Sequence, residues 1–565
     1  MTGNAMPRSR GGLLLKGIVF AALAFTISPL ISFALSAFAG GAGGGWTGSG
    51  RAGAAPAGSL FLSIFSTSTL AALRFSLVQA ALSTLLALAV GLPGAFFVAT
   101  YNFRGRRFFL ALAAIPFCLP PILVILSFIL YYGKSGWFTQ ALASLGIKAG
   151  GGGLLYSLWG LVFVHAFYNF PIVVQSVGSV WTRMPRSREE AARTLGAGRL
   201  HAFATGTLPY LVPSILQSAS LVFLFCFFSF TIVLVFGGLS GSTLEVGIYR
   251  AIRFTNDKPK ALALSLIQTL VALLAVGAFA HFDRRNASLA KGFGSAPPRR
   301  RPGPGSRLAI VSYQLVILLF FLGPLFSLAV EAFTVRASLA GQTRFGLENF
   351  GRLLGGGQAP LLKATVNSLA LSGTAALLAT ILGAAIAASN HYGSPGRKLG
   401  REGGKGISLG SWISTLPLAL SPAVITAGWS SLLSGGSEIL IIIGQTAMAW
   451  PFVARSLAAS FSALDRSKNE AARTLGSGPL HALLRVDAAI MAPSVASAAA
   501  FSFSITMGDV NIPLLLGGGK YETLPLLLYR LTSSYRFSEA CAVGIVLALF
   551  TSAAFFLKEN SDEPS

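Results

Sequence analysis

The feature that most constrains this chain is a series of long apolar blocks that carry no charged face. Residues 12–40 read GLLLKGIVFAALAFTISPLISFALSAFAG, and residues 108–132 read FFLALAAIPFCLPPILVILSFILYY. A helix of about 20 such residues spans the ~30 Å hydrocarbon core of a bilayer. Helices are favoured there because lipid offers no hydrogen-bond partner for backbone N–H and C=O groups. The blocks therefore predict an all-α membrane protein that crosses the bilayer many times.

Twelve blocks of this kind occur along the 565 residues. The first follows Arg8 and Arg10, as a signal peptide would, but it is longer than the apolar region of a signal peptide. It also lacks a clear cleavage site, so we interpret it as an uncleaved anchor. The predicted spans cover residues 13–38, 71–100, 108–132, 154–178, 209–236, 259–281, 308–335, 363–389, 408–433, 437–459, 488–516 and 537–557.

The chain has a net charge of +25, from 43 Lys and Arg against 18 Asp and Glu. The distribution of the positive charges along the chain is the one expected of a membrane protein. Lys and Arg concentrate in the cytoplasmic loops of membrane proteins. We predict a multi-pass protein of the cell (inner) membrane with both termini in the cytoplasm, because every second loop is then basic. The partner of this charge is expected to be the lipid bilayer and not nucleic acid. The basic loops are residues 102–107, 182–193, 283–307, 397–405 and 465–473.

Catalytic and cofactor-binding motifs are absent from the sequence. Cys118, Cys226 and Cys541 lie inside predicted spans without the spacing of metal ligands, and His165 is expected to be a hydrogen-bonded interior residue. No G-x-x-x-x-G-K-[ST] phosphate loop is present. We predict a transport protein that is not an enzyme, has no catalytic or metal-binding residues and binds no cofactor itself. The energy for transport would come from a separate subunit or from an ion gradient.

The chain contains an internal duplication. Pro171 and Pro451 are 280 positions apart, as are Tyr249 and Tyr529, and this offset holds without a gap from about residue 171 to residue 250. Parallel repeats imply a pseudo-two-fold axis along the membrane normal, with a path or site between the halves. We divide the chain into a first half of six spans at 1–282, a basic linker rich in Pro and Gly at 283–307, and a second half of six spans at 308–565. The linker is expected to be a flexible cytoplasmic connector.

One polar heptapeptide, EAARTLG, occurs at residues 190–196 and again at 470–476, on the predicted cytoplasmic side. Each copy completes an S-x-x-E pattern, which predicts a capping box at the start of a helix. Its glycine predicts a left-handed cap at the end. So short a helix is marginal alone in water, which leaves two interpretations: a docking element for a soluble partner, or a capped turn on the membrane surface. Two copies in identical register favour a partner that is itself two-fold.

The heptapeptides and the residues around them resemble the EAA loops of ABC importer permeases, in which E-A-A precedes a glycine and a later Leu-Pro pair. The resemblance covers residues 187–209 and 467–489, which we name the first and second EAA loop. It implies a type I permease fold of about 12 transmembrane helices in two parallel six-helix halves, with both loops seated on ATPase subunits. The first loop has Gly206 where that pattern usually has Ile, and the second has Ala488–Ala489 where Leu-Pro is expected. The residues implied to couple to the ATPases are Glu189, Glu190, Ala191, Ala192, Gly196, Glu470, Ala471, Ala472 and Gly476.

Two permease halves fused in one chain resemble the permeases of thiamine and iron(III) importers. Residues 131–137, 225–238, 243–252 and 507–536 are most similar to the thiamine type. The resemblance implies the permease subunit of an importer for thiamine or its phosphates, with iron(III) as the next candidate. It also implies two ABC ATPase subunits on the cytoplasmic side, which bind ATP and Mg²⁺, and an extracytoplasmic substrate-binding protein.

Asp509 is a carboxylate within or at the end of the eleventh predicted span. A charge at membrane depth costs about 2.5–3.5 kcal/mol and is a functional candidate. Asp509 and Asn511, together with Ser229 at the matching position of the first half, are therefore candidates for the transport path or its outer gate. The alternative is that Gly508–Asp509 breaks the helix and the carboxylate caps backbone groups. In a protein of another class, an ion-coupled secondary transporter with parallel six-helix repeats, Asp509 would be the coupling carboxylate.

Overall fold

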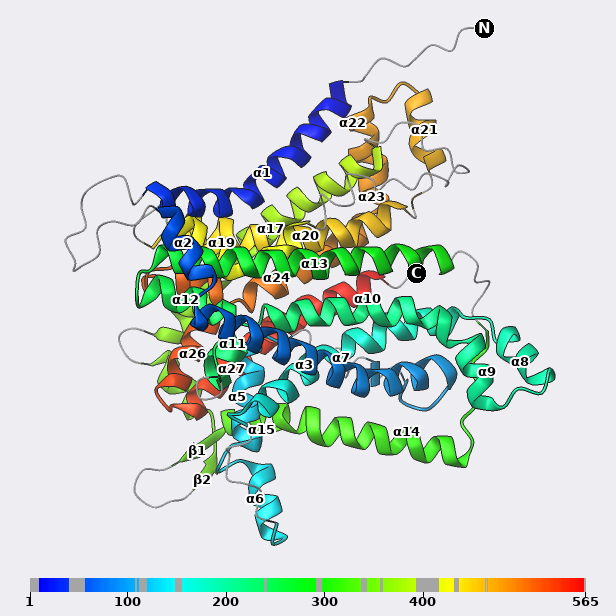
Figure 1. Ribbon diagram of the computed structural model, residues 1–565, viewed down its shortest axis with the longest axis horizontal. Coiled ribbons are helices and arrows are strands. Elements are labelled where there is room, and N and C mark those ends of the chain that lie inside the picture. The colour runs from blue at the N-terminus through cyan, green and yellow to red at the C-terminus, as the bar shows by residue number, and fades with distance from the viewer. Residues whose placement is uncertain are drawn as a thin grey trace. The chain divides into compact units, whose positions relative to one another are not determined.

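The computed structural model is almost entirely helical, which confirms the predicted all-α class (Figure 1). Within the described residues, nine helical segments are long and apolar enough to cross a membrane, and Phe20–Leu35 and Ala492–Met507 are shorter apolar helices. Each of the twelve predicted spans contains helix among its described residues. The structure describes residues 10–562, apart from 40–55, 107–108, 111–118, 148–154, 238–240, 291–296, 337–342, 356–358, 393–415, 431–435, 463 and 465.

The helices form two compact units that do not coincide with the two predicted halves. Unit 1 comprises Met1–Pro56, Gly351–Arg530 and Val543–Ser565, and unit 2 comprises Ala57–Phe350 and Leu531–Ala542. The first span of each half therefore packs with the other half. These two exchanged spans are α1 (Arg10–Ala39) in unit 1, and α14 (Pro304–Ile317), η2 (Leu318–Leu322) and α15 (Gly323–Ala332) in unit 2.

Unit 2 is built around the long helix α3 (Thr67–Thr100), against which α7 (Leu158–Arg183) and α10 (Leu208–Phe227) pack. The exchanged span is held by tyrosine hydroxyls, because Tyr313 Oη donates to Val90 O at 2.9 Å and Tyr132 Oη donates to Phe320 O at 2.8 Å. The other elements are α2 (Pro56–Ile64), α5 (Pro121–Tyr132), α6 (Trp137–Ser144), α8 (Ser187–Thr194), α9 (Arg199–Gly206), α11 (Thr231–Phe236), α12 (Leu244–Arg253), α13 (Lys258–Ala290) and the antiparallel strands β1 (Thr334–Arg336) and β2 (Thr343–Phe345). The chain passes from unit 2 to unit 1 within α16 (Glu348–Leu354).

Unit 1 is built in the same way around α17 (Pro360–Tyr392), against which α20 (Glu438–Ser462) and α24 (Ala492–Met507) pack. The exchanged helix α1 packs against α19 (Pro422–Ser430) at Gly428, where a Cβ atom would overlap the backbone of Pro29. Glycine therefore permits this close approach. The other elements are η3 (Leu416–Ala419), α21 (Arg466–Thr474), α22 (Pro479–Ala482), η4 (Leu483–Asp487), α23 (Ala488–Ile490) and α25 (Asn511–Leu516). Most of α26 (Leu524–Ser533) and α27 (Phe537–Asp562) also belongs to unit 1, whereas Leu531–Ala542 belongs to unit 2.

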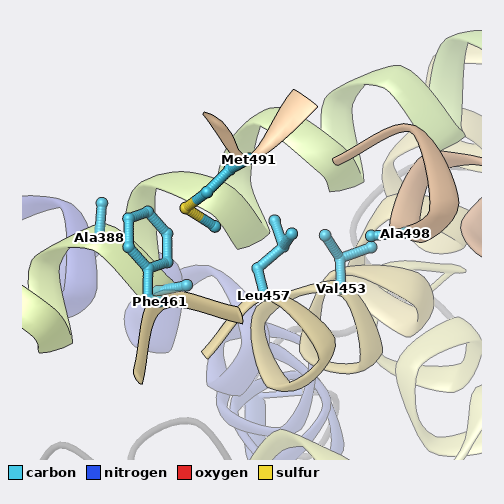
Figure 2. Close-up of a cluster of buried hydrophobic side chains, with 7 residues drawn as sticks. Ala388, Val453, Leu457, Phe461, Met491 and Ala498 are labelled. Carbon is cyan, nitrogen blue, oxygen red and sulfur yellow. The ribbon is translucent and has the colours of Figure 1, made fainter. Parts of the chain in front are cut away.

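The packing of α20 in unit 1 rests on large side chains that face small ones. Val453, Leu457 and Phe461 are four residues apart, so they lie on one face of α20. Alanines on the neighbouring helices let the helices approach closely enough for these side chains to fill the space. Figure 2 shows this cluster, which consists of Ala387, Ala388, Val453, Leu457, Phe461, Met491 and Ala498.

The sequence repeat is also a repeat of structure. α10 ends at Phe227 and α24 at Met507, and α12 begins at Leu244 and α26 at Leu524, so both pairs keep the offset of 280. The polar contacts repeat as well. The amide of Leu244 donates to Ser76 Oγ at 2.9 Å, and the amide of Leu524 donates to Ser368 Oγ at 2.7 Å. The same local fold is thus present once in each unit.

The linker differs from the flexible connector that the sequence predicts. The helix α13 continues to Ala290, so residues 283–290 are helical although they lie beyond the apolar span. Residues 297–303, which we name the linker segment, precede α14. Within this segment Arg300 pairs with Tyr101 as an isolated parallel bridge just beyond the end of α3. The linker is therefore partly fixed to unit 2.

Candidate functional site

The two EAA loops are short helical hairpins between long helices. In unit 2, α8 and α9 connect α7 to α10, and in unit 1, α21 and α22 follow α20. Figure 1 shows α8 and α9 together at one end of the unit 2 helices, with α6 and the β1–β2 hairpin at the other end. The first EAA loop therefore lies at one end of the helices of unit 2 and is separated from the loops at the opposite end.

Both helices of the EAA motif end in the predicted left-handed glycine cap. Gly196 has φ +88° and Gly476 has φ +90°, a region that favours glycine. The amide of Ala197 donates to Ala192 O at 3.0 Å, and the amide of Ser477 donates to Ala472 O at 3.1 Å. These bonds span the glycine as in a Schellman motif. The two loops thus share one rigid shape at this position.

The predicted capping box is wrong for the first loop. The residue before α8 is Arg186, and no side-chain hydrogen bond caps this helix. The two glutamates instead contact other elements, because Glu189 Oε2 accepts from Thr207 Oγ1 at 3.5 Å and Glu190 Oε1 lies 3.6 Å from Arg300 Nη2. The side chain of Glu470 in the second loop lies outside the described part of the structure, so its capping box stays a prediction.

The first EAA loop is fastened to the start of α10. A Cβ atom at Gly206 would lie 3.3 Å from Glu189 Cα, so the glycine that departs from the family pattern lets α9 approach α8 closely. The guanidinium of Arg188 lies 4.0 Å from the ring centre of Tyr210 on α10, within the range of a cation–π interaction. A displacement of α8 would therefore move the end of α10 that adjoins the loop.

The second loop returns to its long helix differently. The π-helix η4 and the three-residue helix α23 precede α24, and Ala492–Pro493 begin α24 with Pro in the first turn. Leu208–Pro209 begin α10 in the same way, so the proline cap stands a few residues farther along in the second copy. The substitution Ala488–Ala489 thus changes the connection, whereas the EAA helix itself keeps its form.

Two leucines that our sequence reasoning missed are the most exposed large apolar side chains among the described residues of these loops. Leu195 is 89% exposed and Leu475 is 88% exposed, each directly before the capping glycine. Ala191 and Ala471 are exposed beside them. The sequence did contain a signal for these leucines, because the same leucine recurs in both copies of an otherwise polar heptapeptide. Each loop therefore presents a small apolar surface, formed by one Ala and one Leu, on an otherwise polar helix.

The candidate path residues lie at breaks in the two span-forming helices. Asp509 is buried between α24 and α25, where its Oδ1 accepts from the amide of Asn511 at 3.0 Å and its Oδ2 from the amide of Ile512 at 3.1 Å. The carboxylate therefore caps α25, which is the geometry of the structural alternative. Ser229 lies at the matching break between α10 and α11, so the predicted single helices at 209–236 and 488–516 are both interrupted.

A buried glutamine donates to a backbone carbonyl at each break. Gln79 Nε2 on α3 donates to Cys226 O at 2.8 Å, and Gln445 Nε2 on α20 donates to Thr506 O at 3.1 Å. Cys226 and Thr506 are matched positions of the repeat, so two different helices supply the same contact. His165 is buried within 3.4 Å of Ser83 Oγ, as an interior hydrogen-bonded residue would be.

Comparison of the chain with known proteins identifies a family that it matches. Residues 91–288 match the family described as binding-protein-dependent transport system inner membrane component. The chain is 29% identical over 500 residues to the thiamine transport system permease protein ThiP of Brucella abortus (strain 2308), which covers 86% of this chain and 87% of that protein. It is 26% identical over 499 residues to ThiP of Escherichia coli (strain K12), covering 86% and 88%.

A third relative is a permease of a different transport system. The chain is 31% identical over 208 residues to the sulfate transport system permease protein CysW of Synechocystis sp. (strain PCC 6803), which covers 35% of this chain and 74% of that protein. A shorter permease therefore aligns with a part of the chain, whereas both ThiP proteins align with nearly all of it. The chain belongs to the family of binding-protein-dependent transport system inner membrane components and is the permease of an ABC importer.

Proposed function

We propose that this permease imports thiamine or its phosphates, with two ABC ATPase subunits on the cytoplasmic side and an extracytoplasmic substrate-binding protein. The observation that carries the substrate is the extent of similarity to the ThiP proteins, which covers 85% or more of both chains in each pair. Iron(III) is the next candidate, on the resemblance of the fused halves. An ion-coupled secondary transporter is disfavoured because the chain belongs to a permease family.

The EAA loops receive the force in this proposal. ATP binding closes the two ATPase subunits, which draws the helices around Glu190 and Glu470 together. In the first loop, α8 is held to α10 through Gly206 and the contact of Arg188 with Tyr210. Movement of the loop would therefore turn α10 and switch the path between the halves from inward-facing to outward-facing. Hydrolysis would reset the cycle.

The proposed orientation has both termini and both EAA loops in the cytoplasm. It is supported by the basic loops of the sequence, which carry Lys and Arg on one side of the membrane. The arrangement within unit 2 agrees with it, because α8 and α9 lie at the opposite end from α6 and the β1–β2 hairpin (Figure 1). In this orientation, Asp509, Asn511 and Ser229 remain proposed residues of the path or outer gate.

Reconstitution of the complete importer in proteoliposomes tests the proposal. We expect thiamine uptake that requires ATP inside the vesicles, and that an excess of iron(III) does not inhibit. The variant Glu190→Lys, Glu470→Lys should lose both uptake and co-purification of the ATPase subunits. Uptake driven by a proton gradient without any ATPase, and abolished by Asp509→Asn, would contradict the proposal and support the secondary transporter.

A further inference from the structure

We propose that the linker segment is a working part of the importer, which fastens the first EAA loop to the cytoplasmic end of α3 through Arg300. Arg300 would be a positioning residue for α8. This inference rests on the proposed function, because it assigns the linker a role in transmitting force from the ATPase subunits. The linker segment would then transmit force as well as connect the two halves.

The backbone of Arg300 is fixed at both of its polar groups. Its amide donates to Thr100 O at 3.0 Å, and its carbonyl accepts from the amide of Asn102 at 2.9 Å. A third contact follows nearby, where Ser306 Oγ and Tyr101 Oη are 3.1 Å apart. Thr100 is the last residue of α3, so these bonds attach the linker segment directly to the central helix of unit 2. A mere spacer would not need them.

The side chain of Arg300 reaches the EAA helix. Its Nη2 lies 3.6 Å from Glu190 Oε1, and Arg186 Nη2, directly before the same loop, donates to Thr100 O at 3.4 Å. Thr100 O therefore accepts from both the linker segment and the residue that precedes the EAA loop. Burial lowers the pKa of Arg186, the charge of Arg300 lowers it further, and Glu190 and Glu189 raise it. Glu190 thus lies in the field of two arginines that are both attached to the end of α3.

This arrangement has a mechanical consequence. A pull on α8 acts on α10 through the covalent chain, and through Arg300 it also acts on α3 and on α14, which begins at Pro304 just after the linker segment. The first EAA loop would then move three helices as one body. The chain has two EAA loops and one linker, so the two loops should respond unequally when this contact is lost.

Charge reversal at Arg300 tests the inference in the complete, reconstituted importer. The matched control is Arg299→Glu, which makes the same change of charge on the neighbouring residue, for which the described part of the structure records no ion pair. We expect Arg300→Glu to retain ATPase co-purification but to lower thiamine uptake per ATP hydrolysed by roughly 1.5- to 5-fold, the range for an exposed ion pair. Arg299→Glu should stay near the wild type. Arg300→Pro, which removes both the guanidinium and the amide donor to Thr100 O, should also reduce coupling.

In a Glu190→Gln background the charge that faces Arg300 is removed while the side chain keeps its length, so Arg300→Glu should lower thiamine uptake per ATP no further than Glu190→Gln does alone. An equal further loss in that background would overturn the inference, as would equal effects of Arg299→Glu and Arg300→Glu. Loss of ATPase co-purification in Arg300→Glu would also overturn it and make Arg300 a docking residue. Failure of the proposed function is a different result, since the wild type itself would then import no thiamine or would bind no ATPase.

Discussion

Replacing Leu195 and Leu475 by alanine should weaken ATPase binding without destabilising the permease. Both side chains are nearly fully exposed in the isolated chain, at 89% and 88%, so their truncation removes almost no internal packing. Burial is worth about 0.8 kcal/mol per CH₂ group, and Leu→Ala removes three carbons. Complete burial on docking would therefore cost up to about 2.4 kcal/mol for each leucine, which is roughly a 60-fold loss of affinity per site.

The assay has two parts. The affinity of the co-purifying ATPase subunits for the permease in nanodiscs is measured for wild type, each single variant and the double variant, and the melting temperature is measured for each permease alone. Leu274→Ala is the matched control, because Leu274 is 69% exposed on the apolar helix α13. We expect unchanged melting temperatures and a loss of affinity only for the loop variants. Wild-type affinity in the double variant would refute the docking surface.

Five further variants test the local geometry. Gly196→Ala and Gly476→Ala place a Cβ in the left-handed region, which costs about 1–2 kcal/mol, so substrate-stimulated ATP hydrolysis should fall about 5- to 30-fold. Gly428→Val should lower the melting temperature through overlap with Pro29, at about 1–3 kcal/mol or more. Asp509→Ala should destabilise the permease by about 1–3 kcal/mol for each amide left unbonded, and Asp509→Asn should do so less, because one acceptor oxygen remains. Calorimetry or thermal-shift measurement in detergent checks the variants at Gly428 and Asp509.

The glycine variants have controls in the chain. Gly198→Ala lies within the first EAA loop, between α8 and α9, at φ −64° and with no atom near its would-be Cβ, so ATP hydrolysis should not change. Gly373→Ala on α17 is also unobstructed and should not lower the melting temperature. Equal losses in Gly198→Ala and Gly196→Ala would argue against the left-handed cap as the cause. A melting temperature for Asp509→Ala equal to that of wild type would argue against the capping role.

The spans and the caps could be predicted from sequence because their causes are local. An uninterrupted apolar block predicts a membrane helix wherever it packs, and the glycine of EAARTLG predicts a left-handed residue from its immediate neighbours. The break at Gly508–Asp509 was one of the two alternatives that the sequence left open, because both residues can interrupt helices. The matching break at Ser229 was not, since FSF gives no such signal. Only the register of the repeat could have indicated it.

The exchange of the first spans could not be predicted, because an apolar helix carries no local information about its neighbours. Gly428 lies where α1 packs, but the need for glycine there comes from the close backbone of Pro29, about 400 residues earlier. The capping box of the first EAA loop failed for a similar reason. Its Glu190 contacts Arg300, 110 positions along the chain and in a linker predicted to be flexible. Long-range contacts decided both outcomes.

The claim that the two EAA helices receive force from the ATPase subunits is tested most directly by site-specific cross-linking in a working importer. Single cysteines at positions 195 and 475, in a background without the native cysteines, are joined to the ATPase subunits in the presence and absence of ATP. We predict cross-links from both positions, with yields that change between the two nucleotide states during thiamine uptake. Active uptake with no cross-link at either position would contradict the account. Reaction of cysteines 195 and 475 only with reagents on the extracytoplasmic side would contradict it as well.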